Sequence, residues 1–209
     1  MTPKRICNNV EALLSKLGFT IQDAVYLPTV IEPNAVENQC FNPVDAQVLK
    51  HGGRKVLGWQ IAITPMLIEA LLHAVWEDPN GALIDLRLNA TPCRQILFVV
   101  DGNIQYDGKQ IDSHRMNILG NQLVDDFIEI FEVIFRIYNK GDREYNNSLS
   151  EDDLDSNERS AMSFLESMKK PLYGMVMENL TYQSQCPCQS GKEYQDCHGY
   201  ELKCLMSCF

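Results

Sequence analysis

Residues 71–86 read LLHAVWEDPNGALIDL, which is two apolar runs on either side of a turn sequence. The turn, Asp-Pro-Asn-Gly at 78–81, has proline at its second position and glycine at its fourth. This order is typical of a type I turn closed by a glycine with positive φ, as in the three-residue hairpin loop. The sequence therefore predicts two antiparallel strands in the register that puts Val75 opposite Asp85.

This register places His73 and Asp85 on the same face of the predicted hairpin. They are diagonal neighbours, roughly 7–8 Å apart at the backbone, which is within reach of a hydrogen bond from an imidazole to a carboxylate. A two-residue loop would shift the register and put the two side chains on opposite faces. The three-residue loop thus predicts a paired histidine and aspartate.

A cysteine stands upstream, at a predicted helix start. Cys40 lies just before Asn42 and Pro43, which are a typical cap residue and a typical first-turn residue. A thiol at this place lies near the positive end of the helix dipole, which lowers its pKa, and near free N–H groups that can bind an oxyanion. The glycines at 52–53 end the helix early, and Gln39 or Asn42 is a candidate oxyanion donor.

Cys40, His73 and Asp85 are together the parts of a catalytic triad, with the histidine as base and the aspartate as its orienting group. In chain order, and with Trp76 shortly after the histidine, the region resembles the transglutaminase-like branch of the papain-type cysteine enzymes. The resemblance implies acyl transfer on a protein or peptide amide, by a peptidase, a deamidase or an amide-exchange enzyme. The alternative is that the histidine is a hydrogen-bonded strand residue and the cysteine a small core residue.

A second motif lies near the C-terminus, where residues 186–199 read CPCQSGKEYQDCHG. It contains three thiols and one imidazole, from Cys186, Cys188, Cys197 and His198. Three cysteines and one histidine are a standard tetrahedral ligand set for structural zinc, and four protein ligands leave no open position for catalysis. We expect one structural Zn²⁺ per chain.

The Cys-Pro-Cys, Ser-Gly-Lys, Tyr and Cys-His-Gly elements of this stretch resemble the SEC-C motif, the zinc-binding tail of the SecA preprotein translocase. Glu193 stands where that family usually has a basic residue, and Gln195 and Asp196 add no positive charge. The module is therefore expected to contact a protein rather than a nucleic acid.

Composition sets further limits on the class of protein. The 209 residues carry a net charge of −10. They are 45% hydrophobic, which is enough for one well-packed hydrophobic core and a small second one. Such acidity argues against a nucleic-acid binder, which needs a clustered basic surface. No uncharged apolar run is long enough to span a membrane. Of eight cysteines, five lie outside the predicted zinc site, and an odd number without a disulfide framework favours the cytoplasm.

Periodicity predicts an α+β fold: a small, mostly antiparallel sheet packed by helices, with a C-terminal zinc knuckle. The expected strands are 56–63, 67–77, 82–88 and 96–100. The expected helices are 6–17, 118–138, which would cover the sheet, and 158–180, kinked or interrupted at Pro171. The proline-punctuated segment 25–38 is expected to be non-helical. The domains are expected to be 1–140, with the thiol site, an acidic linker at 141–157, and 158–209, with the zinc module.

Two function classes follow from the sequence. In the first, the main domain is a cysteine-dependent acyl-transfer enzyme that carries a zinc module. In the second, the protein is a non-catalytic zinc-binding adaptor that recognises a protein partner. The state of Cys40 discriminates between them, because an enzyme needs this thiol acidic and partly exposed. The sequence leaves the substrate, the oligomeric state and the role of Cys204 and Cys208 open.

Overall fold

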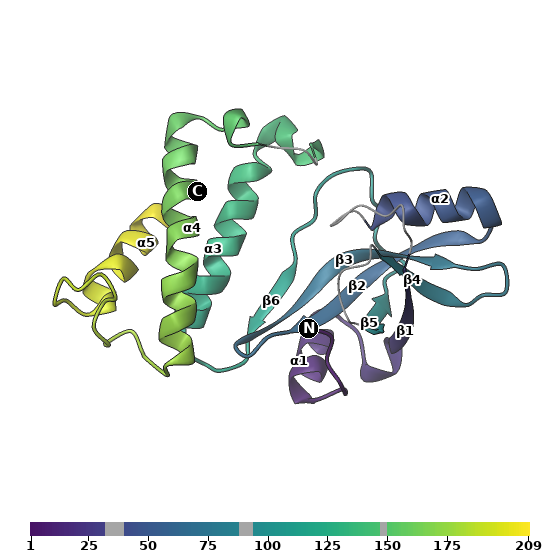
Figure 1. The fold of residues 1–209 in the computed structure, drawn as a ribbon, viewed down its shortest axis with the longest axis horizontal. Coiled ribbons are helices and arrows are strands. Elements are labelled where there is room, and N and C mark those ends of the chain that lie inside the picture. Colours follow the sequence, from purple (N-terminus) through teal and green to yellow (C-terminus); the bar gives the residue numbers. More distant parts are fainter. Residues whose placement is uncertain (32–39, 88–93, 147–149) are drawn as a thin grey trace. The chain divides into compact units, whose positions relative to one another are not determined.

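A computed structural model of the protein describes residues 1–31, 40–87, 94–146 and 150–209 (Figure 1). The chain forms two compact units. The first contains residues 1–105 and 113–116, and the second contains residues 106–112 and 117–209. The α+β fold class predicted from the sequence is confirmed.

The first unit is built on a mixed sheet that closes into a small barrel. Its strands are β1 (Ala24–Ile31), β2 (Arg54–Ile63), β3 (Leu67–Glu77), β4 (Leu83–Arg87), β5 (Gln95–Val100) and β6 (His114–Asn117). The strand order is β2-β5-β1-β4-β3-β6, and the additional pairing of β2 with β3 closes the barrel. β1 and β4 are parallel, whereas β1–β5, β2–β3, β2–β5 and β3–β4 are antiparallel.

The predicted hairpin turn is confirmed in detail. The amide of Asp78 donates to the carbonyl of Ala82 at 2.9 Å, and Gly81 adopts a φ of +88°. The ladder pairs Trp76 with Ile84 and Glu77 with Leu83, which is the predicted register. A three-residue loop thus joins β3 to β4, as the turn sequence predicts.

The sequence did not reveal β1. Its segment contains Pro28, which lacks the N–H that a regular ladder uses, and was expected only to be non-helical. The structure places Ala24–Ile31 in the sheet, with Leu27 buried and Pro28 paired with Gln95. The rest of that segment, from residue 32 on, lies outside the described residues.

Two helices belong to the first unit. α1 (Asn8–Lys16) buries Val10, Leu13 and Leu14. α2 (Phe41–His51) packs on β3 and ends at Gly52, whose φ of +75° suits a helix stop. α1 agrees with the periodicity of the sequence, and α2 agrees with the helix start predicted from Asn42 and Pro43.

The second unit is helical and contains α3 (Gln122–Tyr138), α4 (Ser156–Met177) and α5 (His198–Met206). α4 continues through Pro171 without interruption. α3 was expected to cover the sheet; the contacts that it makes within this unit are with α4 and α5. None of the helices in the described part of the chain is long and apolar enough to cross a membrane.

The acidic segment after α3 connects two helices of the same unit. It contains short 3₁₀ turns at Gly141–Tyr145 and Glu151–Asp153. Arg143 donates to both carboxylate oxygens of Glu158, at 2.7 and 2.8 Å. The structure thus divides the chain before α3, whereas the sequence suggested a division after residue 140.

Candidate thiol site and candidate metal centre

Cys40 lies at the start of α2, in helical geometry with φ −73° and ψ −22°. It is half-buried and packs with Val44, Ala74 and Leu86. The ladder between β3 and β4 begins at Trp76 and Ile84, and nearby on β3 the backbone of Ala74 interacts with the Cys40 thiol and helps to lower its pKa. The helix start and this strand therefore hold the sulfur from two sides.

His73 and Asp85 form the pair that the hairpin register predicts. The imidazole Nε2 of His73 lies 2.7 Å from the carboxylate Oδ1 of Asp85. Both residues are buried, with exposed fractions of 8% and 0%. The side chain of His73 also lies next to the Cys40 thiol and interacts with it, which lowers the pKa of the thiol. Because Nε2 is taken by the aspartate, Nδ1 is the nitrogen left for the thiol.

The electrostatics of this cluster favour a charged pair. Burial opposes a charge on His73, but its hydrogen bonds to Asp85 and Cys40 raise its pKa to about 9. Burial likewise opposes a charge on Cys40, but the hydrogen bond and the charge of His73, with backbone N–H groups, lower its pKa. A thiolate beside an imidazolium is the form that these contacts stabilise.

Asp85 is held by two further groups that sequence reasoning missed. The hydroxyl of Thr29 donates to its Oδ2 at 2.8 Å, and the Nε of Arg87 donates to the same oxygen at 2.6 Å. Thr29 lies directly opposite Asp85 in the parallel β1–β4 ladder. Arg87 could have been noticed, since it is two residues after Asp85 on the same strand face. Thr29 could not, because its strand was not predicted.

Three other residues were singled out in the sequence near the thiol site: Asn42, Gln39 and Trp76. Asn42 is exposed in the first turn of α2, and its role as an oxyanion donor stays a prediction. Gln39 lies outside the described residues. The indole Nε1 of Trp76 donates to the carbonyl of Gly52 at 2.9 Å, so this aromatic residue fastens the end of α2 to β3.

The predicted metal ligands converge at the C-terminus of the chain. The ligand atoms of Cys186, Cys188, Cys197 and His198 all lie within 4.8 Å of one another. The sulfurs of Cys188 and Cys197 are 3.5 Å apart, and His198 Nδ1 is 3.1 Å from Cys186 Sγ. Zinc–sulfur bonds of about 2.3 Å separate the sulfurs of a tetrahedron by about 3.8 Å. Three thiols and an imidazole at these separations fit a metal such as zinc.

Local backbone geometry forms the knuckle. The amide of Cys186 donates to the carbonyl of Lys192 at 2.9 Å, and Gln185 bridges to Glu193. Between them the chain turns through positive φ at Gln189 (+61°) and Gly191 (+77°). Cys197 then caps α5, whose first residue is His198.

The knuckle is docked within the second unit. Tyr194 is fully buried, and its hydroxyl donates to Asp126 of α3 at 3.0 Å. Tyr182 donates to the same carboxylate. Phe164 of α4 stacks on the ring of His198, with centroids 6.3 Å apart. The tyrosine of the motif therefore acts as an anchor, a role that its spacing alone did not indicate.

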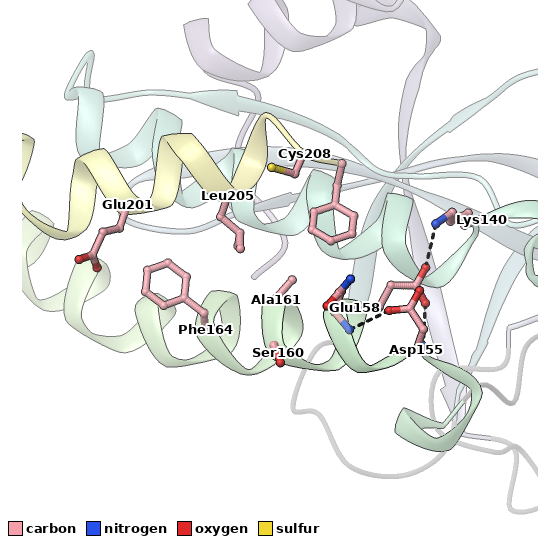
Figure 2. Close-up of a pocket in the computed structure, with 11 residues that line it drawn as sticks. Lys140, Asp155, Glu158, Ser160, Ala161, Phe164, Glu201, Leu205 and Cys208 are labelled. Carbon is pink, nitrogen blue, oxygen red and sulfur yellow. Dashed lines mark hydrogen bonds and ion pairs between the residues drawn. The ribbon is translucent and has the colours of Figure 1, made fainter.

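A cavity of about 700 Å³ lies between α4 and the end of α5 (Figure 2). Ala161 and Phe164 from α4 and Leu205 and Phe209 from the C-terminal segment give it an apolar lining. Glu158 at one end is already bonded to Lys140, at 3.2 Å. The residues of the thiol site take no part in this lining.

Comparison with known proteins supports the C-terminal assignment. Residues 184–199 match the family model of the SEC-C motif. No curated protein and no solved structure matches the chain. The resemblance to the transglutaminase-like enzymes therefore has no support from these comparisons, and the thiol site rests on its geometry.

Proposed function

We propose that the first unit is a cysteine-dependent acyl-transfer enzyme that hydrolyses a protein or peptide amide. The observation that carries this proposal is the order of contacts from the Cys40 thiol to His73 and from His73 Nε2 to Asp85 Oδ1, at 2.7 Å. A helix start, a buried histidine and a buried carboxylate in this order match the needs of nucleophilic catalysis.

In the first step, the thiolate sulfur of Cys40 attacks the carbonyl carbon of the amide, and the carbonyl electrons move onto oxygen. Backbone N–H groups at the start of α2 are the proposed donors to that oxyanion. His73 gives its proton to the amine nitrogen as the carbon–nitrogen bond breaks. The products are a thioester on Cys40 and a free amine.

In the second step, neutral His73 takes a proton from water while the water oxygen attacks the thioester. The carbon–sulfur bond breaks, the carboxylic acid leaves, and the thiolate and imidazolium are restored. Asp85 does not change its protonation. It keeps Nε2 of His73 bonded, so that Nδ1 faces the sulfur in both steps.

For the second unit, we propose that the ion in the Cys₃His cluster is one structural Zn²⁺ per chain. Four protein ligands fill a zinc coordination sphere, and the docked knuckle supports a structural rather than a catalytic role. The zinc module would contact a protein, either the substrate or a partner.

The proposal is tested with p-nitrophenyl acetate, an activated ester that acylates a catalytic thiol without substrate specificity. We expect an acetyl group on the Cys40 peptide by mass spectrometry, followed by release of acetate to water. The exposed Cys204 and Cys208 serve as internal reference thiols. His73→Ala should slow acetylation of Cys40 at least about 100-fold, the lower range of general acid–base effects.

Acetylation of Cys40 no faster than that of Cys204 would overturn the enzyme assignment. The same result would favour the zinc-binding adaptor, in which the first unit is inert.

A further inference from the structure

A chain of polar contacts continues from Asp85 into the barrel. The Nε of Arg87 donates to Asp85 Oδ2 at 2.6 Å, and its Nη2 donates to Gln60 Oε1 at 2.7 Å. Thr29 donates to the same Oδ2 at 2.8 Å. Arg87 and Thr29 bond Oδ2 of Asp85, and His73 bonds Oδ1. Both carboxylate oxygens of Asp85 therefore have partners.

This chain lies on the inner face of the barrel. Side chains alternate along a strand, so His73 shares a face with Val75, and Thr29 shares a face with Leu27. Val75 and Leu27 belong to the buried cluster that also contains Phe98, whose ring lies 6.3 Å from that of His73. The polar groups therefore lie on the same inner face of the barrel as this apolar cluster.

We propose that Arg87 is a positioning residue of the thiol site, which acts through Asp85 on His73 and Cys40 and is itself fixed by Gln60. This inference rests on the proposed function and deepens it. Arg87 supplies a positive charge that balances the negative charge of the fully buried Asp85. Without Arg87, the cluster of Cys40 thiolate, His73 imidazolium and Asp85 carboxylate would carry one net negative charge.

The charged groups around this cluster are few in the described residues. His73 on β3 and Arg87 on β4 act on Asp85, and Asp85 and Cys40 act on His73. β1 and β2 contribute the uncharged side chains of Thr29 and Gln60 to this cluster, and β5 contributes the ring of Phe98. With Arg87 in place, the thiolate, the imidazolium, the carboxylate and the guanidinium carry two negative and two positive charges.

The sign of the effect follows from the charge alone. Removal of a positive charge raises the pKa of every nearby group, because protonation then becomes easier. Arg87→Gln should therefore raise the pKa of both His73 and Cys40. A loss of packing alone would lower stability without moving the two titrations together.

The experiment measures both titrations in the full-length protein loaded with zinc. The pKa of His73 is read from the NMR shift of its labelled ring, and that of Cys40 from the pH dependence of its alkylation by iodoacetamide. In Arg87→Gln we expect both midpoints to rise by about half a unit or more. Arg87→Lys, which keeps the charge but not the planar fork, should shift them less.

Arg54→Gln is the matched control. Arg54 lies on the same barrel, but its side chain is 71% exposed and it pairs with Glu77 at 2.7 Å. Its removal changes the net charge equally and should leave the midpoints of His73 and Cys40 unchanged. An equal shift in Arg54→Gln would show a general charge effect and would overturn the proposal.

A folded Arg87→Gln variant with both midpoints unchanged would also overturn it. Failure of the proposed function has a different signature, since wild-type Cys40 would then be alkylated no faster than Cys7. In that case a raised His73 midpoint in Arg87→Gln still supports the action of Arg87 through Asp85, and an unchanged one overturns it.

Discussion

The imidazole Nε2 of His73 lies 2.7 Å from the carboxylate Oδ1 of Asp85, across a hairpin whose loop has three residues. The turn sets this contact, because a loop shorter by one residue would turn one side chain to the opposite face of the sheet. The pair then decides which nitrogen of His73 remains for Cys40. The positive φ of Gly81, which the three-residue loop requires, thereby influences the environment of the Cys40 thiol.

The Asp85→Asn variant should lower the pKa of His73 from about 9. Burial opposes the imidazolium, and without the carboxylate the largest of the contacts that favour it is lost. Alkylation of Cys40 near neutral pH should slow at the same time. NMR titration of the His73 ring checks the first expectation, and peptide mass spectrometry checks the second. An unchanged His73 midpoint in the folded variant would contradict the account.

Metal content should depend on the four clustered ligands and not on the two tail thiols. We expect about one zinc per chain in the wild type. Cys186→Ser and Cys197→Ser should lose it, because a three-ligand site binds zinc much more weakly. Cys204→Ser and Cys208→Ser should retain it, since both thiols lie outside the cluster. Elemental analysis of the purified variants measures this, and loss of metal from the tail variants would argue for a different ligand set.

Two helical glycines should respond to alanine in opposite directions. A Cβ at Gly199 would lie 2.6 Å from Cε1 of the buried Tyr194, so Gly199→Ala should destabilise the zinc module by about 1–3 kcal/mol. A Cβ at Gly174 meets nothing within 4 Å, so Gly174→Ala should stabilise α4 by about 0.5–1 kcal/mol. Amide hydrogen exchange of α5 and α4 measures each effect. Equal responses would mean that Tyr194 does not pack as described.

Glu158 should make the second unit sensitive to acid. Its hydrogen bonds to Arg143, against a smaller effect of burial, lower its pKa to about 2. A lowered pKa of an acid means that its stabilisation is complete above the ordinary value of 4.5 and is lost as the pH falls through about 2. The stability difference between wild type and Glu158→Gln should therefore shrink over this range, as read by hydrogen exchange of α4.

Glu166→Gln is the control for that measurement. Glu166 also pairs with a cation, Lys169, but its side chain is 52% exposed. Exposed pairs contribute little to stability, so this variant should differ from the wild type by less than about 1 kcal/mol at every pH. A difference for Glu158→Gln that stays constant from pH 5 to about 2 would contradict the ion pair.

The sequence predicts the local parts of this structure well. The hairpin register, the start of α2 and the metal-ligand cluster each follow from a few adjacent residues whose chemistry permits one arrangement. What it misses is non-local. β1 has a proline within it and no alternating pattern, so neither the parallel pair with β4 nor the contact of Thr29 with Asp85 could be anticipated.

The packing of α3 was missed for a similar reason. An amphipathic helix shows which of its faces is buried but not which partner covers it. The stripe of α3 fits a sheet as well as a helix, and only the tertiary contacts with α4 settle the choice. The anchoring of Tyr194 on Asp126 was equally invisible, since the two residues are 68 positions apart.

The most direct test of the account is the pH dependence of alkylation at each cysteine of the zinc-loaded protein, read by peptide mass spectrometry. We predict that the Cys40 thiolate forms at a midpoint well below the ordinary thiol value of about 8.5, and that His73→Ala raises this midpoint. Rapid alkylation should therefore begin at lower pH for Cys40 than for Cys7. A Cys40 midpoint at the ordinary value, unchanged in His73→Ala, would contradict a thiolate–imidazolium pair and with it the proposed enzyme.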